Sequence, residues 1–497
     1  MSKKIKQFHL YILLFTVCCL MFEKISFSQI SKLRNQIALL QGDTDFVYAS
    51  WSVCVLDVKK DSVIAEYNST LGLVPASCQK IITTAAALSI LGHKFKYETY
   101  LEYDGKLDLG TLNGNLYIKG GGDPTLDSET FKKKNDTVSL TDKWAAIIKS
   151  KGIKKIKGAV IADASVFEDE MIPCTWIWGD MGNYYGAGAS GLSFKDNKFA
   201  LYFKSGTKKD DSTFITKIFP EIPGMQIINY VKTGGTSDNA FIYGAPYEEL
   251  HYVRGTIPFN KTNYEVEGSI SDPSLFCAQS LNNSLIKIGV VIDKEPTTIR
   301  DLQLENKNLK LETRKRLHTQ TSRSLEEIIY QTNLQSNNLF AEHLLKTIAM
   351  KKTKFGEYQT GINIVTNFWK SKGVDMKGFY MYDGCGLSRW NLVSTKQLSE
   401  ILRVITLDSV LFEKFYNCLP VAGKNGTLGK LCRGTAAENN IHAKSGYMTR
   451  VRSYAGYVTS KKGNLISFAI IVNNYDCSPT QVKEKLEKLM ITMAEME

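Results

Sequence analysis

The sequence predicts an α/β (α+β) fold in which a helix-rich unit is split by a strand-rich insertion. Two observations indicate this arrangement. Helical periodicity occurs before residue 95 and returns from Ser324, whereas residues 96–295 carry short alternating runs divided by Gly, Asp and Asn. The chain has 497 residues, with 43% hydrophobic and 23% charged, so it can bury a sizeable core in about three domains.

The first residues have the composition of a secretory signal peptide, which we predict over residues 1–28. Three early lysines precede an uncharged stretch from Leu10 to Phe22, and Ser26-Phe27-Ser28 supplies small residues for cleavage. A bilayer span needs roughly 20 apolar residues, and this stretch is shorter. We therefore expect an exported, periplasmic protein; an uncleaved anchor is the alternative.

The charge balance of the chain is basic. The net charge is +12, and removal of residues 1–28 takes away four lysines and one glutamate, leaving +9. A basic exported protein is attracted to anionic membrane head groups or wall polymers, so a peripheral contact with them is expected. The alternative is a charge that serves solubility alone. The sequence has no interleaving of basic and aromatic residues, so nucleic acid is not an expected partner.

Cysteine and histidine spacing argues against metal chemistry. Eight cysteines remain after the predicted cleavage, and none forms a Cys-x-x-Cys pair. The six histidines show no zinc-ligand spacing, so neither a metal nor another cofactor is expected. Export permits disulfides, but their pairing does not follow from the sequence.

The expected elements follow the chain in order. The unit begins with residues 29–95, which hold a short helix, a hairpin with strands at 51–57 and up to Tyr67, and a helix from Ser77 to near Gly92. The insertion spans residues 96–295 and carries strands at 116–119, 158–162, 199–203, 225–231 and 240–243. Residues 296–497 complete the unit, with helices at 324–332, 339–350, 361–371 and 479–493, and strands at 440–443, 451–459 and 465–473.

A serine and a lysine stand one turn apart where the first long helix begins. Ser77 and Lys80 lie on the same helical face, and the Ser77 hydroxyl is near the positive end of the helix dipole. A serine next to an amine is typical of a nucleophile activated by a base. Serine is also a favoured N-cap residue, so a purely structural role is the alternative.

Two later segments supply groups that such a nucleophile needs. Ser336-Asn337-Asn338 precedes a predicted helix, and Lys444-Ser445-Gly446 lies where a strand meets the terminal sheet. Lys232-Thr233-Gly234 and Ser237-Asp238-Asn239 have similar spellings, but they are almost adjacent and cannot line opposite walls of one cleft. We interpret them as a glycine-rich turn.

The three motifs Ser-x-x-Lys, Ser-x-Asn and Lys-Ser-Gly, in this order, resemble those of the class C low-molecular-mass penicillin-binding proteins. This is the D-Ala-D-Ala carboxypeptidase/endopeptidase family of serine peptidases. The resemblance covers nearly all of the mature chain and includes segments at 121–126, 178–180, 383–389 and 419–423. It implies a penicillin-binding-protein transpeptidase-like/serine β-lactamase fold, with the insertion between the first two motifs.

The resemblance also implies residue roles. Ser77 would attack the penultimate D-alanine carbonyl of a peptidoglycan stem peptide and Lys80 would take its proton. Ser336 would relay a proton to the leaving amine, while Asn338 would hold the substrate amide. Lys444 and Ser445 would bind the terminal carboxylate. The backbone N–H groups of Ser77 and Tyr447 would form the oxyanion hole, and Gly446, between Ser445 and Tyr447, would belong to the same substrate-binding segment. The implied activity is a serine DD-peptidase that penicillins acylate and so inhibit.

Some positions depart from the family pattern. Ser445 replaces the usual Thr, Tyr447 stands where Thr or Ser is usual, and Cys385 stands where Ser is usual. Two alternatives therefore remain open, a related serine β-lactamase or esterase and a catalytically inactive peptidoglycan-binding protein.

Lys80 must be neutral to act as a base. Two like charges about 4 Å apart repel by roughly 4 kcal/mol at an effective dielectric near 20, so Lys444 is expected to lower the pKa of Lys80.

Overall fold

One antiparallel sheet joins the two ends of the chain. In the computed structural model, which describes residues 32–132, 136–307 and 313–497, its five strands have the order β18-β19-β20-β1-β2. The strands are β1 (Ser50–Asp57), β2 (Ser62–Tyr67), β18 (His442–Met448), β19 (Val451–Thr459) and β20 (Leu465–Asn473). The predicted signal peptide at 1–28 lies outside the described residues.

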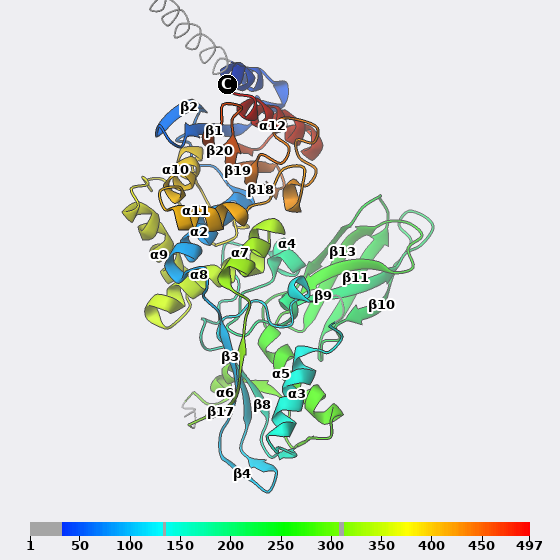
Figure 1. Cartoon of the computed structure of the whole chain (residues 1–497). Helices are drawn as coiled ribbons and strands as arrows, with labels where there is room; N and C mark the ends of the chain where they lie inside the picture. Colours follow the sequence, from blue (N-terminus) through cyan, green and yellow to red (C-terminus); the bar gives the residue numbers. More distant parts are fainter. Residues whose placement is uncertain (1–31, 133–135, 308–312) are drawn as a thin grey trace, which may run out of the picture.

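Helices cover both faces of this sheet, because alternate residues of β20 point to opposite sides. Ala469 and Ile471 pack into a core with α2 (Gln79–Leu91), α8 (Asn338–Thr353) and α10 (Thr395–Ile405). Phe468 and Ile470 pack on the other side against α12 (Pro479–Ala494) and the helix of residues 32–41. Figure 1 shows the blue N-terminal helix beside the red C-terminal one.

Three further helices complete the upper part of the molecule in Figure 1. They are α7 (Leu325–Leu334), α9 (Tyr358–Ser371) and α11 (Ser409–Asn417). The Ser324 side chain caps α7, and Glu327 returns the bond to the Ser324 backbone, which explains where this helix starts. The predicted helices at 324–332, 339–350 and 361–371 are confirmed, each with somewhat different ends.

The first module of the insertion is a five-stranded sheet of order β16-β8-β6-β3-β17. Its strands are β3 (Glu98–Tyr103), β6 (Leu116–Lys119), β8 (Val160–Asp163), β16 (Thr297–Thr298) and β17 (Lys315–Thr321), and α3 (Leu140–Ser150) and α5 (Pro273–Lys287) contribute to the same core. Strands β4 (Lys106–Asp108), β5 (Thr111–Asn113), β7 (Lys155–Ile156) and β15 (Val291–Ile292) form a small adjoining sheet, and α6 (Ile299–Glu305) follows β16.

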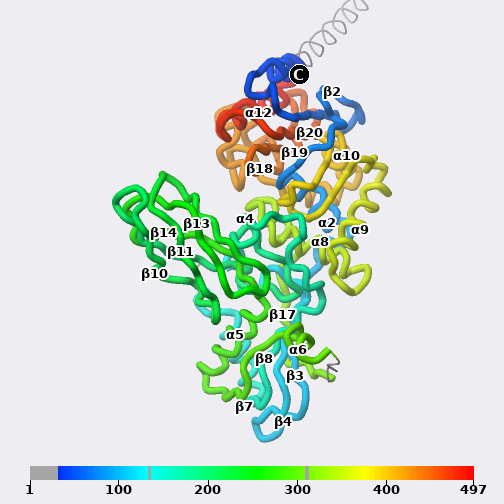
Figure 2. Tube along the Cα trace, turned by 180° about the vertical axis from the view of Figure 1, so that it is seen from behind, coloured from blue at the N-terminus to red at the C-terminus, as the bar shows by residue number. Residues whose placement is uncertain are grey.

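The second module of the insertion has two three-stranded sheets. One has the order β10-β9-β14, with β9 (Lys198–Lys204), β10 (Phe214–Phe219) and β14 (Tyr264–Ser269). The other has the order β11-β13-β12, with β11 (Gln226–Thr233), β12 (Asn239–Tyr243) and β13 (Leu250–Ile257). Figure 2 shows from behind that this module projects to one side of the chain. The five strands predicted here and in the first module are confirmed.

Strand pairing bears on where the insertion ends. β16 pairs with β8, and β17 pairs with β3, although both follow residue 295. We therefore propose that the insertion runs to Thr321, further along the chain than the boundary expected at residues 295/296; the other predicted boundaries stay as proposed.

The strand predicted at 440–443 runs instead from His442 to Met448. Its pairing with β19 continues from His442 opposite Tyr457 to Met448 opposite Val451, so it includes the whole Lys-Ser-Gly motif. Pairing with a neighbouring strand outweighs the weak strand preference of Lys and Gly.

No helix of the described residues is both long enough and apolar enough to cross a membrane.

Candidate active site

Ser77 lies in a short 3-10 turn, η2 (Ala76–Cys78), directly before α2. Lys80 follows in the first turn of α2, and its Nζ lies 3.0 Å from Ser77 Oγ. Ala76 has a φ of 46°, an uncommon value for a residue with a Cβ. Such backbone strain is concentrated at functional sites, and here it sets the turn that presents Ser77.

Two further oxygen atoms hold the Lys80 amine. Its Nζ donates to Asn338 Oδ1 at 2.6 Å and to the Cys385 carbonyl oxygen at 2.8 Å. When Lys80 is neutral, its two N–H groups satisfy these acceptors and its lone pair is left to accept the Ser77 hydroxyl proton. The packing therefore orients the amine for use as a base.

The pKa of Lys80 is lowered by a different effect from the one expected. Lys80 is fully buried, and this burial lowers its pKa, while the nearby Asp383 side chain opposes the change. Repulsion between the two lysines affects Lys444 instead. Burial and the charge of Lys80 together lower the pKa of Lys444 to about 7. The expectation that Lys444 is what lowers the pKa of Lys80 is thus corrected: desolvation is the larger effect.

Lys444 links the second and third motifs. Its Nζ donates to Ser336 Oγ at 2.9 Å and to the Ser445 carbonyl oxygen at 2.7 Å. Ser336 occupies the loop between α7 and α8 with a φ of 59°, so the loop makes a tight left-handed turn there. The Ser445 hydroxyl donates to Thr427 Oγ1 at 2.8 Å, which adds a hydroxyl from outside the three motifs.

Gly446 lets β18 approach Ser77. A Cβ at this position would lie 2.7 Å from the Pro75 carbonyl oxygen, 3.0 Å from the Ser77 nitrogen and 2.2 Å from Ser453 Oγ. Real side chains do not fit such distances, so only glycine allows the strand to lie this close. The backbone of β18 therefore passes close to the Ser77 nitrogen.

These groups open onto a cleft of about 510 Å³. Ser77, Ser336 and Asn338 line it, and the side chain of Tyr447, 54% exposed, stands at its edge. The insertion contributes α4 (Trp178–Met181) and η4 (Tyr184–Gly186) to one wall.

Several cleft residues were absent from the predicted site. The Tyr185 carbonyl oxygen accepts a bond of 2.8 Å from Asn338 Nδ2, which fixes the amide so that its oxygen faces Lys80. Asp180, Lys198 and Arg389 bring charges of both signs to the cleft. Asp180 and Arg389 lie in segments that the family resemblance includes, so the sequence could have indicated them as site residues. No sequence pattern indicated Lys198.

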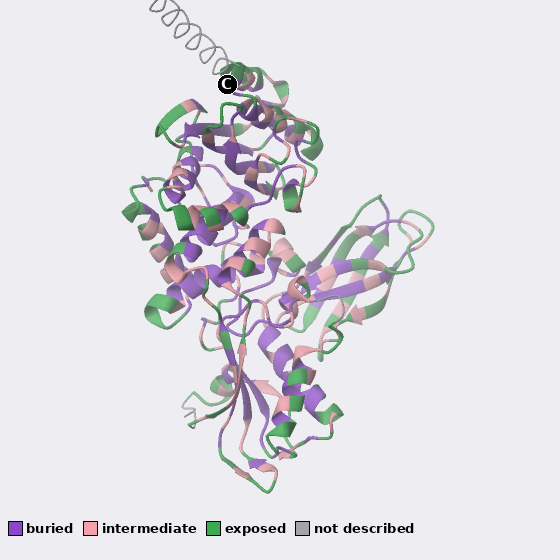
Figure 3. Ribbon diagram, in the orientation of Figure 1, coloured by how far each residue is buried: buried purple, intermediate pink, exposed green. Residues whose placement is uncertain are grey.

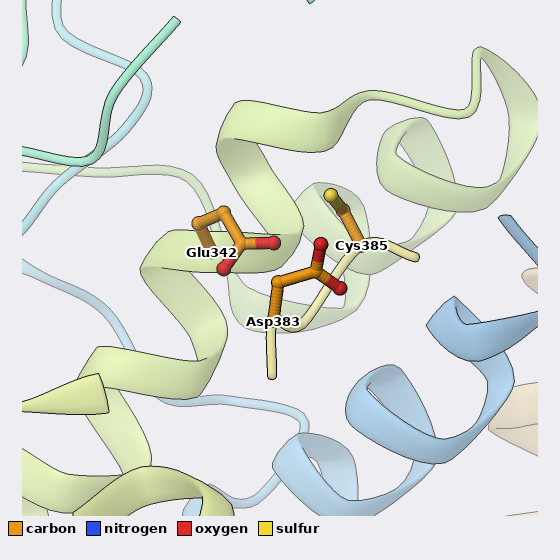
Figure 4. A group of neighbouring side chains, drawn as sticks. All are labelled: Glu342, Asp383 and Cys385. Carbon is orange, nitrogen blue, oxygen red and sulfur yellow. The ribbon is translucent and has the colours of Figure 1, made fainter. Parts of the chain in front are cut away.

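Glu342, Asp383 and Cys385 form a buried cluster (Figure 4), and the side-chain atoms that could hold a metal lie within 4.8 Å of one another. We tested whether it suits a metal ion. Asp383 accepts four hydrogen bonds, from the Gly386 and Ser388 backbone N–H groups and from the side chains of Trp176 and Asn391. Its lone pairs are therefore occupied, and the carboxylate organises the loop whose Cys385 carbonyl holds Lys80.

The other two members of the cluster are held in their neutral forms. Burial raises the pKa of Glu342 to about 8 and raises the pKa of the Cys385 thiol well above its usual value. Metal ligands must be deprotonated, so these groups do not fit a metal site.

Cys78, next to Ser77, is a buried thiol. Its Sγ–H donates to the Lys444 carbonyl oxygen at 3.2 Å, and burial raises its pKa to about 11. It is therefore not a thiolate nucleophile at neutral pH. The eight cysteines of the described residues are all free, and Cys174 is exposed.

Several known proteins are similar to this chain. The model of the D-Ala-D-Ala carboxypeptidase 3 (S13) family matches residues 33–496. The chain belongs to this family. A D-alanyl-D-alanine carboxypeptidase DacB of Haemophilus influenzae is 26% identical over 453 residues, covering 87% of each chain. A D-alanyl-D-alanine carboxypeptidase of Actinomadura sp. (strain R39) is 26% identical over 475 residues, covering 90% of this chain and 82% of the relative.

A solved structure shares the fold of this S13 family member. Penicillin binding protein 4 (dacB) from Haemophilus influenzae has a TM-score of 0.77 at 22% identity, covering 93% of this chain and 97% of that one. The predicted α/β fold class, split by its insertion, and the family resemblance are confirmed.

Proposed function

We propose that this chain is a serine DD-peptidase of peptidoglycan. It releases the terminal D-alanine of D-Ala-D-Ala stem peptides through a Ser77 acyl-enzyme, cleaves D-Ala cross-links, and is acylated by penicillins. The observation that carries this proposal is the 3.0 Å contact between Lys80 Nζ and Ser77 Oγ, with Asn338 holding the same amine. Two relatives named as D-alanyl-D-alanine carboxypeptidases support it, and the Haemophilus protein has also been solved with a β-lactam.

Acylation begins with the substrate carboxylate. The carboxylate binds near Lys444 and Ser445 and keeps Lys444 charged, so Lys80 is the amine that gives up its proton. Lys80 then accepts the Ser77 Oγ proton as the oxygen attacks the penultimate carbonyl carbon. The backbone N–H groups of Ser77 and Tyr447 stabilise the oxyanion that forms, where Gly446 permits close approach.

Collapse of this intermediate breaks the peptide bond. The leaving D-alanine amine takes the proton that Lys80 removed from Ser77, relayed by the Ser336 hydroxyl that Lys444 Nζ holds at 2.9 Å, so Lys80 is neutral again. A water molecule then attacks the Ser77 ester and gives a proton to Lys80, which returns it to the departing Ser77 Oγ as the shortened stem peptide leaves. Asn338 holds the peptide amide during both steps.

Two finer parts of the proposal concern location and surroundings. The signal-like residues 1–28 support export to the periplasm. The net charge of +9 on the remaining chain supports a peripheral contact with anionic membrane or wall polymers. Sedimentation with anionic vesicles across a salt series tests that contact, because an electrostatic interaction weakens as salt rises.

The first experiment is an acylation assay. Residues 29–497 are incubated with a fluorescent penicillin and read by intact mass, beside Ser77→Ala and the control Ser237→Ala, which changes an exposed serine of the similar but distant Ser237-Asp238-Asn239 segment. We expect one adduct in wild type and control and none in Ser77→Ala. If the folded wild-type protein forms no adduct, the proposal is wrong, and a wall-binding protein is the favoured interpretation.

Product analysis separates the remaining candidates. D-alanine release from a D-Ala-D-Ala pentapeptide is the expected activity. An adduct that forms but is hydrolysed within seconds, with no D-alanine released, would indicate a β-lactamase or esterase instead.

A further inference from the structure

The second module of the insertion carries an exposed aromatic face. Along β11 and β13, residues of one face are mostly buried or half-buried, and those of the other face are exposed or half-buried; Figure 3 colours these strands by burial. The outward residues include Tyr230, which is 50% exposed, and Phe241 of β12, which is 43% exposed. Soluble proteins seldom leave adjoining large apolar groups exposed without an interaction that uses them.

Strand register assembles these side chains into two rows. Tyr230, Arg254 and Phe241 are direct partners across β11, β13 and β12, and Ile228, Tyr252 and Tyr243 form the neighbouring row. We call these six side chains the aromatic face. The rows are two residues apart along each strand, or about 7 Å. The Arg254 guanidinium lies 4.6 Å from the Tyr230 ring centroid, so a hydrogen-bond donor is set among the rings.

This face is continuous with the active-site cleft by two routes. The ring of Trp178, 58% exposed, lies 4.9 Å from that of Tyr243 and is tilted 54° to it, and two residues later α4 contributes Asp180 to the cleft. A groove of about 380 Å³ between η4 and the edge strands β12 and β14 is lined by both Tyr184 and Phe241. Tyr184 also lines the cleft.

We propose that the aromatic face, with Trp178 and the groove beside it, binds the glycan strand of the same peptidoglycan whose stem peptide occupies the cleft. This inference rests on the proposed function. Sugar rings present flat C–H faces that pack on aromatic rings, and their hydroxyl and acetamido groups accept hydrogen bonds from a guanidinium such as Arg254. A ligand that touches both the cleft and this face must extend from one to the other, and a peptide attached to a polysaccharide does so.

The test separates glycan binding from peptidase activity. Tyr230→Ala/Phe241→Ala removes two rings that lie outside the cleft, and Phe214→Ala removes a 66% exposed ring from β10 of the opposite sheet as the matched control. Binding to peptide-free glycan strands is measured by sedimentation, and kcat/KM is measured on a soluble pentapeptide and on intact sacculi.

We expect the double variant to bind glycan strands about tenfold more weakly than wild type and the control to bind unchanged. Activity should fall by a similar factor on sacculi and stay unchanged on the pentapeptide. Equal glycan binding by all three proteins would overturn the inference, as would wild type that fails to bind glycan. A wild-type dimer that the double variant disrupts, with glycan binding unaltered, would assign the face to self-association.

Failure of the proposed function has a different signature. Wild type would then leave the pentapeptide intact, whatever its affinity for glycan.

Discussion

Replacement of Glu342 by Gln should stabilise the protein at neutral pH. The Glu342 side chain is fully buried; Oε2 accepts a 3.0 Å bond from the Gly384 N–H, and Oε1 has no hydrogen-bond partner among the described residues. Burial and the charge of Asp383 raise its pKa from 4.5 to about 8. The folded protein therefore keeps this carboxyl protonated at pH 7, and glutamine is its closest uncharged replacement.

The sign and size follow from proton linkage. Between pH 4.5 and about 8 the unfolded chain has released the Glu342 proton and the folded chain has not, so stability falls as pH rises. The slope is at most about 1.4 kcal/mol per pH unit. From pH 5 to pH 7, the free energy of unfolding of Glu342→Gln should therefore rise relative to wild type by about 2–3 kcal/mol.

Urea unfolding at pH 5, 6, 7 and 8 measures this difference, because other titrating groups cancel between the two proteins. Glu413→Gln, at an exposed position of α11, controls for loss of a carboxylate alone. A difference that stays constant from pH 5 to pH 8 would refute the reasoning, since it would mean that Glu342 has the same protonation in both states.

Three further predictions concern the catalytic groups. Gly446→Ala should slow acylation by penicillin at least about 100-fold, because its Cβ would strike Pro75 and push β18 away from the Ser77 nitrogen; acylation within threefold of wild type would contradict this. Asn338→Ala should slow acylation about 100-fold through loss of the 2.6 Å contact that orients Lys80, with unfolding measured alongside to exclude a folding defect. On peptides, kcat/KM should fall above about pH 7 as Lys444, with a pKa lowered to about 7, loses the charge that holds the carboxylate. A penicillin ester, which has no carboxylate, should lack that decline; the same decline for both substrates would assign it to another group.

Local sequence was sufficient to predict that Ser77 and Lys80 lie side by side and to predict the order of the elements. Ser77 and Lys80 are three residues apart at a helix start, so helical geometry alone brings them together. The alternation of apolar residues likewise predicted strands such as β6 and β9, because the period of a strand is a property of a few consecutive residues.

Tertiary structure decided what surrounds that pair. Lys80 is held by Asn338 and Cys385, which are 258 and 305 residues away, and no local pattern predicts those contacts. Its pKa depends chiefly on exclusion of water by the whole core, so the sequence pointed to the neighbouring charge of Lys444 and missed the larger effect of burial. The strand ends at β18 and the pairing of β17 with β3 were likewise set by partner strands distant in the chain. Desolvation and strand pairing are properties of the packed molecule, and local sequence governs neither.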